Sequence, residues 1–184
     1  MKKQLFLLDG HALAYRSYFG MMRVPMSNSS GVPTGAVYGF VNSIIKLLTQ
    51  YECPYFASVF DSTVPSFRAD IYPEYKANRE KMPEDLQKQM PLIFKFVECL
   101  NTQVFRQEGL EADDIIADLT RQAVLNGFHV YIITKDKDLM QLVNDSVTML
   151  VPDTKKGIIP FGPEDVKKKM GVPPSQISDL LSLM

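Results

Sequence analysis

The 184-residue sequence contains no tryptophan, two cysteines and two histidines. Cys53 and Cys99 match no metal-ligand spacing and indicate no disulfide framework, which is typical of a protein kept in a reducing cytosol. His11 and His129 form no pair with ligand spacing, so a zinc site is not expected.

Long apolar runs are also missing. The run Leu5–Leu8 ends at Asp9, well short of the roughly 7–15 apolar residues that a secretory signal needs. No other stretch has the length of a transmembrane helix, so we expect a cytoplasmic protein with no membrane partner. The formal net charge of −1 gives no general attraction to nucleic acid, so such a partner would have to meet a local basic patch.

The length is that of one domain, and its apolar segments alternate between strand-like runs and helical periodicity. We expect an α/β fold with a mostly parallel central sheet. Pro91 predicts either a kink or a new helix start. The strands are expected at 5–8, 55–60, 102–105, 129–134 and 147–151, with 158–159 pairing back, and the helices at 11–22, 35–51, 84–100, 112–126, 139–143, 163–170 and 174–184.

Three carboxylates lie within four residues at the expected start of the helix after residue 110. Glu111, Asp113 and Asp114 are surrounded by Leu110, Ala112, Ile115 and Ile116. Acids at a first helical turn often cap free amides and complement the helix dipole. Three of them beside apolar residues also repel one another, and a hard divalent cation would relieve that repulsion. Both interpretations remain open for this stretch alone.

Further aspartates follow the expected strands. Asp9 ends the first strand, Asp61 ends the second, and Asp136 and Asp138 follow the strand at 129–134. Each could be an ordinary turn or cap residue. Parallel strands bring their carboxyl ends to one sheet edge, however, so four such groups predict a cluster of oxygen ligands for Mg²⁺ or Mn²⁺. A cluster of this kind supports two-metal hydrolysis of phosphodiester bonds.

Residues 65–90 are less apolar and carry several cations, Arg68, Lys76, Arg79 and Lys81. Neighbouring acids nearly balance these charges, so the segment is either a solvated surface or a mobile basic arm that contacts phosphates. Two tyrosines of the segment could stack on bases. Tyr15 and Arg16 allow the same two interpretations, since an aromatic residue at helical spacing is often part of the core.

Seven stretches together carry a family resemblance. The chain resembles the 5′-nuclease family, which includes the N-terminal domain of bacterial DNA polymerase I and is related to the flap endonucleases. The stretches keep the family's order over essentially the whole chain, and they are Leu8-Asp9-Gly10-His11 with Ala14-Tyr15-Arg16, Ala36-Val37-Tyr38-Gly39-Phe40, Val59-Phe60-Asp61, Pro65-Ser66-Phe67-Arg68, Tyr72-Pro73-Glu74-Tyr75-Lys76-Ala77-Asn78-Arg79, Glu111-Ala112-Asp113-Asp114 and Thr134-Lys135-Asp136-Lys137-Asp138-Leu139.

The resemblance implies a PIN-like fold with a helical arch at about 65–90. It implies a metal-dependent 5′-3′ exonuclease and 5′-flap endonuclease of DNA replication and repair, using two Mg²⁺ or Mn²⁺ ions. Expected partners are DNA with a 5′ single-stranded flap or end, and RNA in RNA–DNA hybrids; the protein is expected to be a monomer. The expected metal ligands are Asp9, Asp61, Glu111, Asp113, Asp114, Asp136 and Asp138; the expected catalytic residues are Asp9, Lys76, Arg79 and Asp113; and the expected DNA-binding residues are Tyr15, Arg16, Arg68, Tyr75, Lys76 and Arg79.

The chain also departs from the family. A Gly-Asp-x-x-Asp-Asn motif and a helix-hairpin-helix follow the position of Met184 in the family, and this sequence contains neither. We therefore expect residues 1–184 to form the N-terminal domain with impaired cleavage. A single-strand ribonuclease of the wider PIN-like group and an inactive nucleic-acid-binding chain are the alternatives.

Overall fold

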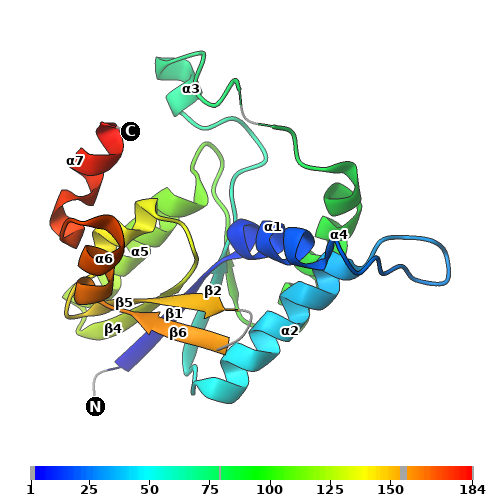
Figure 1. Ribbon diagram of the computed structural model, residues 1–184, viewed down its shortest axis with the longest axis horizontal. Coiled ribbons are helices and arrows are strands. Elements are labelled where there is room, and N and C mark those ends of the chain that lie inside the picture. Colours follow the sequence, from blue (N-terminus) through cyan, green and yellow to red (C-terminus); the bar gives the residue numbers. More distant parts are fainter. Residues whose placement is uncertain (1–2, 79, 154–156, 184) are drawn as a thin grey trace.

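The computed structural model describes residues 3–78, 80–153 and 157–183. A six-stranded sheet in the order β3-β2-β1-β4-β5-β6 forms its centre (Figure 1). Neighbouring strands run parallel except β5 and β6, which pair antiparallel. The expected α/β fold is confirmed. The strands are β1 Lys3–Asp9, β2 Tyr55–Val59, β3 Gln103–Phe105, β4 Phe128–Ile133, β5 Val147–Asp153 and β6 Gly157–Phe161.

Helices cover both faces of the sheet. None of those in the described ranges is both long and apolar enough to cross a membrane. The α-helices are α1 Gly10–Met21, α2 Gly35–Gln50, α3 Arg68–Ile71, α4 Glu84–Cys99, α5 Ala112–Leu125, α6 Pro163–Met170 and α7 Ile177–Ser182, and the 3-10 helices are η1 Asp138–Leu142 and η2 Pro174–Gln176.

The central strand β1 separates two apolar cores, because successive side chains of a strand point to opposite faces. Phe6 and Leu8 pack with α1, α2 and α4, whereas Leu7 packs with α5 and the C-terminal elements. All three side chains are fully buried. The continuous apolar run that predicts this strand is therefore explained by burial on both faces.

Most expected elements are present with boundaries shifted by one or two residues, and two expectations need correction. The prediction that a new helix might start at Pro91 is wrong, because α4 continues through it. Pro91 and Gln87 are both exposed, so water can solvate the carbonyl that loses its partner. Of the helix expected at 139–143, residues 139–142 belong to the 3-10 helix η1. Of the expected C-terminal helix, residues 174–176 form the 3-10 helix η2, and Met184 lies outside the described residues.

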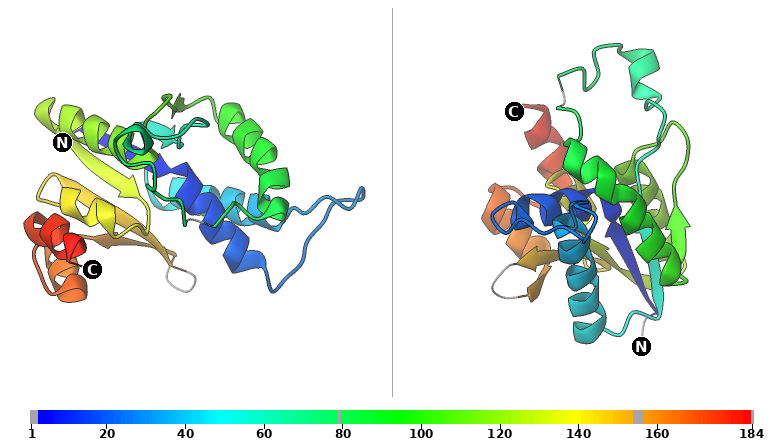
Figure 2. Two further views of the ribbon diagram at one scale, coloured as in Figure 1. Left: turned by 90° about the horizontal axis from the view of Figure 1, so that it is seen from above. Right: turned by 90° about the vertical axis from the view of Figure 1, so that its right-hand side faces the viewer.

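The segment 65–83, called the arm below, rises beyond the sheet edge (Figures 1 and 2). Its described helical part is the four-residue α3, which is followed by turns over residues 73–78; α4 begins at Glu84. Within the arch expected at about 65–90, the described helical residues are those of α3 and the beginning of α4 from Glu84. Arg79 lies outside the described residues.

Two glycines of α1 allow a matched test of packing. Gly10 is buried directly after Asp9, and a methyl group there would overlap the ring of Phe60, whereas Gly20 has nothing within 4 Å of the same added atom. We expect Gly10→Ala to lower the free energy of unfolding by about 1–3 kcal/mol through overpacking. Gly20→Ala should raise it by about 0.5 kcal/mol through reduced backbone entropy.

Urea denaturation of both variants beside the parent chain measures these values. Two shifts of the same sign would contradict the close approach of α1 to Phe60.

Candidate metal centre and nucleic-acid interface

From β1, the strands β2 and β3 follow on one side of the sheet, and β4, β5 and β6 follow on the other. The topological switch point of the sheet therefore lies between β1 and β4. In open α/β sheets, ligands bind beyond the carboxyl ends of the strands at such a point. Asp9 is the last residue of β1, and Asp136 and Asp138 follow β4. Asp61 follows β2, and Asp113 lies in the first turn of α5. The fold therefore gathers aspartates from distant parts of the chain at one edge.

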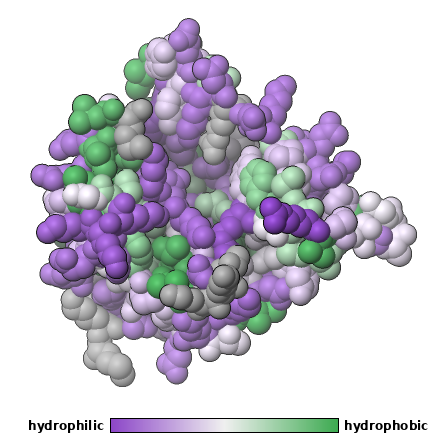
Figure 3. Space-filling model, viewed as in Figure 1, coloured by the Kyte–Doolittle hydropathy of each residue, from purple (hydrophilic) through white to green (hydrophobic). Residues whose placement is uncertain are grey.

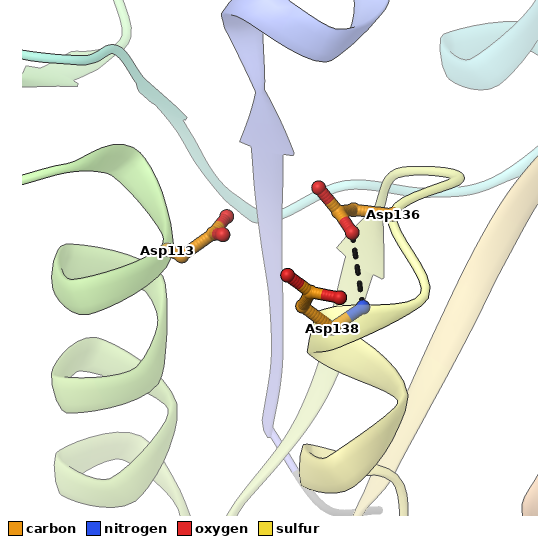
Figure 4. Close-up of side chains that lie close together, drawn as sticks. All are labelled: Asp113, Asp136 and Asp138. Carbon is orange, nitrogen blue, oxygen red and sulfur yellow. Dashed lines mark hydrogen bonds between the residues drawn. The ribbon is translucent and has the colours of Figure 1, made fainter. Parts of the chain in front are cut away.

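Three of these aspartates form a compact group among the described residues. Asp113 reaches across from α5 toward Asp136 and Asp138 in the loop and helix that follow β4 (Figure 4). One carboxylate oxygen from each lies within 4.8 Å of the others. The backbone amide of Asp138 donates a hydrogen bond of 2.9 Å to Oδ1 of Asp136, which orients that carboxylate. A group of three carboxylate oxygens has the donor chemistry that Mg²⁺ and Mn²⁺ take.

Asp9 is held rigidly beside this group. It is only 4% exposed, and its Oδ1 accepts a hydrogen bond of 3.0 Å from the amide of Ala12, capping α1. Its Oδ2 accepts a bond of 2.9 Å from the hydroxyl of Thr134. The same hydroxyl accepts a bond of 3.0 Å from the amide of Asp136. The buried Thr134 therefore connects two of the predicted ligands.

Asp61 is fixed from two sides. Its Oδ1 accepts a bond of 2.8 Å from the amide of Ala112, at the start of α5. Its backbone amide donates to Nδ1 of His11 at 3.0 Å, and its Oδ2 lies 3.1 Å from the same nitrogen. His11 thus ties the end of β2 to the start of α1.

The clustered carboxylates hold protons more tightly than isolated ones. Burial, followed by repulsion from Asp61 and Asp136, raises the pKa of Asp9 to about 6. Burial and the charges of Asp136, Asp9, Asp61 and Asp138 raise the pKa of Asp113 to about 7. Five aspartates thus share one electrostatic field, and a divalent cation among them would offset their repulsion. The residues present fit such a cation.

The other two predicted ligands contact the arm. Asp114 accepts a bidentate pair of bonds from Arg68, at 2.8 and 2.7 Å, which lowers the pKa of Asp114. Glu111 lies 2.8 Å from Nζ of Lys76 and accepts a bond of 3.2 Å from the hydroxyl of Tyr75. Sequence reasoning grouped all seven acids together, whereas the structure brings these two to the arm.

The backbone of the arm is unusual at Lys76, which has a φ of 57°. This left-handed conformation is uncommon for a residue other than glycine and is often found at functional sites. The ammonium of Lys76 lies 5.2 Å from the centre of the Tyr75 ring, and the Arg68 guanidinium lies 6.0 Å from it. The arm therefore presents its cations beside an aromatic ring above the start of α5.

The remaining predicted nucleic-acid contacts lie on α1. Tyr15 is half-buried against the core and its ring stacks near Phe19, with centroids 6.4 Å apart. Arg16 is half-buried near Asp153. Tyr15 also lines a cleft of about 280 Å³ with His11, Asp61 and Lys76. The position predicted at Arg79 cannot be compared, because it lies outside the described residues.

Sequence reasoning missed Thr134 and His11 as parts of the site. Thr134 directly follows β4 and lies two residues before Asp136, and His11 follows Asp9-Gly10 in the chain. Their proximity to predicted ligands was a usable signal. A hydrogen bond across 125 residues, such as that between Thr134 and Asp9, has no counterpart in local sequence.

Comparison with known proteins agrees with this geometry. Residues 4–171 match the family model described as "5'-3' exonuclease, N-terminal resolvase-like domain". The chain belongs to this family. As a member of the 5′-3′ exonuclease N-terminal family, it is 44% identical to DNA polymerase I of Treponema pallidum and 39% identical to that of Bacillus subtilis (strain 168). Both matches cover 100% of the chain but only 18% and 21% of those relatives, so it spans about a fifth of their length.

Solved structures share the fold of this 5′-3′ exonuclease domain. The T5 D15 protein, co-crystallised with metal ions, superposes with a TM-score of 0.72 at 22% identity, over 99% of this chain and 66% of that one. The catalytic core of Rad2 in complex with DNA substrate gives a TM-score of 0.55 at 16% identity, over 96% of this chain and 52% of that one. The predicted PIN-like 5′-nuclease fold is confirmed.

The raised pKa of Asp113 predicts a pH-dependent effect on stability. Its folded-state pKa of about 7 lies above the ordinary 3.8, so the folded state binds more protons between these values. Stability therefore falls as pH rises through that window. Without metal at pH 8, the free energy of unfolding of Asp113→Asn should be about 1–2 kcal/mol higher than that of the parent, after allowance for solvent screening. The difference should shrink at pH 5.

Asp118→Asn is the matched control, because Asp118 lies on the same helix but is exposed and paired with Arg121 at 2.7 Å. Chemical denaturation in EDTA at both pH values measures the effect. Equal stability of parent and Asp113→Asn at pH 8, or an equal gain in Asp118→Asn, would refute the repulsion described here.

The bonds of Thr134 predict a second effect, on metal affinity. Thr134→Val keeps the shape of the side chain but removes the hydroxyl that orients Asp9 and Asp136. Loss of such a supporting partner typically weakens metal binding by about 10–100-fold. Thr134→Ser should retain most of the affinity, measured by calorimetric titration with Mn²⁺.

Thr120→Val serves as the control, because the Thr120 hydroxyl is buried and has no hydrogen-bond partner among the described residues. If Thr134→Val bound Mn²⁺ as tightly as Thr120→Val, Thr134 would have no role in positioning the ligands.

Proposed function

We propose that this chain is the catalytic part of a metal-dependent 5′ nuclease that hydrolyses DNA phosphodiester bonds. The observation that carries the proposal is the convergence of Asp113, Asp136 and Asp138, within 4.8 Å of one another, beside the buried Asp9. Membership of the 5′-3′ exonuclease family supports the same reaction. The relatives that are named DNA polymerase I support a role in DNA replication and repair.

Two Mg²⁺ or Mn²⁺ ions are the proposed cofactors. Asp9, Asp61, Asp113, Asp136 and Asp138 would hold them, and the oxygen-only donor set supports this choice. Bound ions of this kind supply an activated water and neutralise charge on the leaving oxygen. The T5 D15 protein was co-crystallised with metal ions, which supports the assignment. Glu111 and Asp114 remain predicted ligands whose present contacts are to the arm.

The arm would position the scissile phosphate. Lys76 and Arg68 present positive charge in a cleft that Asp113 and Asp138 also line, and both cations lie within ion-pair distance of Glu111. Tyr15 and Tyr75 are both half-buried, and the part of each ring that remains accessible is proposed to stack on bases. Arg79 is proposed for the same role from the family resemblance alone. The proposed substrate is therefore DNA with a 5′ single-stranded flap or end.

Two alternatives use the same residues. A single-strand ribonuclease would need the same carboxylates but no ordered basic arm, whereas Arg68 here is fixed by a bidentate contact to Asp114. RNA in RNA–DNA hybrids is retained as a secondary substrate, and the protein is proposed to act as a monomer. The second alternative is a chain that binds nucleic acid without cleaving it.

A cleavage time course tests the proposal. The chain is incubated with a labelled 5′-flap DNA or a linear single-stranded RNA, with Mn²⁺ or with EDTA. We expect metal-dependent release of the flap and slower RNA cleavage, and we expect Asp113→Asn to abolish both. Preferred cleavage of the RNA would favour the ribonuclease, and metal-bound protein that binds but never cuts DNA would favour the inactive binder.

The variant Lys76→Ala shows whether Lys76 positions the scissile phosphate or only binds DNA, because turnover and affinity are measured on the same flap DNA. Loss of a preorganised charge beside the reacting group typically lowers turnover by about 10²–10³-fold. Affinity for the same flap DNA should change much less, because Lys76 is one of several cations of the arm. An equal loss of turnover and affinity would make Lys76 a binding residue only.

A further inference from the structure

The arm has no apolar core of its own. Helix α3 contains no buried residue, and every described residue of the segment 65–83 is exposed or half-buried. Figure 3 shows hydrophilic residues over most of this projecting part of the molecule. A segment with so few buried contacts opens easily unless specific polar contacts hold it. The position of the arm therefore depends on the contacts that it makes with α5.

Asp114 holds the arm through Arg68. Its Oδ1 accepts a bond of 2.7 Å from Nη2 of Arg68, and its Oδ2 accepts one of 2.8 Å from Nη1. A carboxylate and a guanidinium that pair through two parallel bonds are fixed in orientation as well as in distance. Oδ2 of Asp114 also accepts a bond of 3.2 Å from the amide of Glu111. Both oxygens of Asp114 are therefore already engaged.

The preceding residue, Asp113, has different surroundings. One of its carboxylate oxygens lies within 4.8 Å of oxygens of Asp136 and Asp138 (Figure 4), and Asp114 is not part of this group. A cation at Asp113 would meet carboxylates that repel one another, whereas a cation at Asp114 would first have to displace the guanidinium of Arg68. The two adjacent aspartates therefore suit different partners.

The position of Arg68 is linked to that of Lys76. The guanidinium of Arg68 lies 6.0 Å from the centre of the Tyr75 ring, and the ammonium of Lys76 lies 5.2 Å from it. A cleft of about 310 Å³ is lined by Arg68, Tyr75 and Lys76 of the arm and by Asp113 and Asp138 of the metal centre. An arm that is fixed at Arg68 therefore holds the ammonium of Lys76 in the cleft that the aspartates line.

We propose that Asp114 is a positioning residue, which anchors the arm through Arg68 and thereby places Lys76 beside the metal centre. In this role Asp114 is not a metal ligand and Arg68 serves the arm in place of DNA, in contrast to the roles that the family resemblance implies for both residues. The effect on Lys76 rests on the proposed nuclease function, whereas the anchor itself does not.

Hydrogen exchange followed by mass spectrometry tests the anchor in EDTA, without DNA. Asp114→Asn keeps the size of the side chain but removes its charge, and the amides of residues 65–78 should exchange about tenfold faster than in the parent. Arg68→Lys should give the same increase, because lysine cannot form the bidentate pair. The double variant should exchange no faster than either single variant, since both changes break one contact. Unchanged exchange of β1 in the same samples reports an intact fold.

Calorimetric titration with Mn²⁺ distinguishes an anchor from a ligand. Asp114→Asn should change the affinity by less than about fivefold, which is the effect of one solvent-screened charge. Asp113→Asn should weaken it by at least about 10–100-fold, the loss typical of residues that only support a ligand. On a 5′-flap DNA, Asp114→Asn should lower kcat by as much as about 100-fold through misplacement of Lys76, with little change in KM.

Asp118→Asn is the matched control, because Asp118 lies on the same helix and its described side-chain bonds are to Arg121 and Gln122. It should change neither the exchange of the arm, nor the Mn²⁺ affinity, nor kcat. Unchanged exchange of the arm in Asp114→Asn, or an equal increase in Asp118→Asn, would overturn the anchor. A loss of Mn²⁺ affinity equal to that of Asp113→Asn would make Asp114 a ligand.

The two proposals fail separately. Faster exchange of the arm with an unchanged kcat would overturn the effect on Lys76 and leave the anchor in place. A parent chain that neither binds Mn²⁺ nor cleaves DNA would remove the proposed function, and the exchange measurement would still decide the anchor because it needs neither metal nor substrate.

Discussion

Carboxylates that lie close together repel one another, and the carboxyl edge of this sheet gathers five of them. Three of them accept hydrogen bonds that fix them in place: two donors hold Asp9, the amide of Ala112 holds Asp61, and the amide of Asp138 holds Asp136. The repulsion that remains is visible in the raised pKa values of Asp9 and Asp113. Stored repulsion of this kind favours cation binding, because a cation removes it.

The acidic residues at the start of α5 divide into two roles. Asp113 faces the aspartates that follow β4, whereas Asp114 and Glu111 face the arm. A residue and its successor on a helix point about 100° apart, so adjacent acids cannot serve one site in the same way. Both Asp114 and Glu111 also complete a capping box, in which the amide of Glu111 donates to Asp114 at 3.2 Å. The first turn of α5 therefore contacts the arm through Glu111 and Asp114 and the metal centre through Asp113.

Helix α1 organises the surfaces around that centre. Asp9 caps its start, and the helix carries Tyr15 and Arg16. The close approach of Gly10 to Phe60 sets how near the helix lies to the end of β2. The positions of Tyr15 and Arg16 relative to the aspartates thus depend on one packing contact beneath them.

Local sequence by itself determined the strands, most helix boundaries and the position of an aspartate after each central strand, because apolar periodicity and turn chemistry act over a few residues. The family resemblance added the fold and the expected ligands. Only the tertiary structure decided which acids meet. Pairing of β1 with β4 brings Thr134 to Asp9, and the arm's return to α5 takes Glu111 and Asp114 to Lys76 and Arg68. These contacts join residues 35 to 125 positions apart, and their geometry depends on packing that no local pattern encodes.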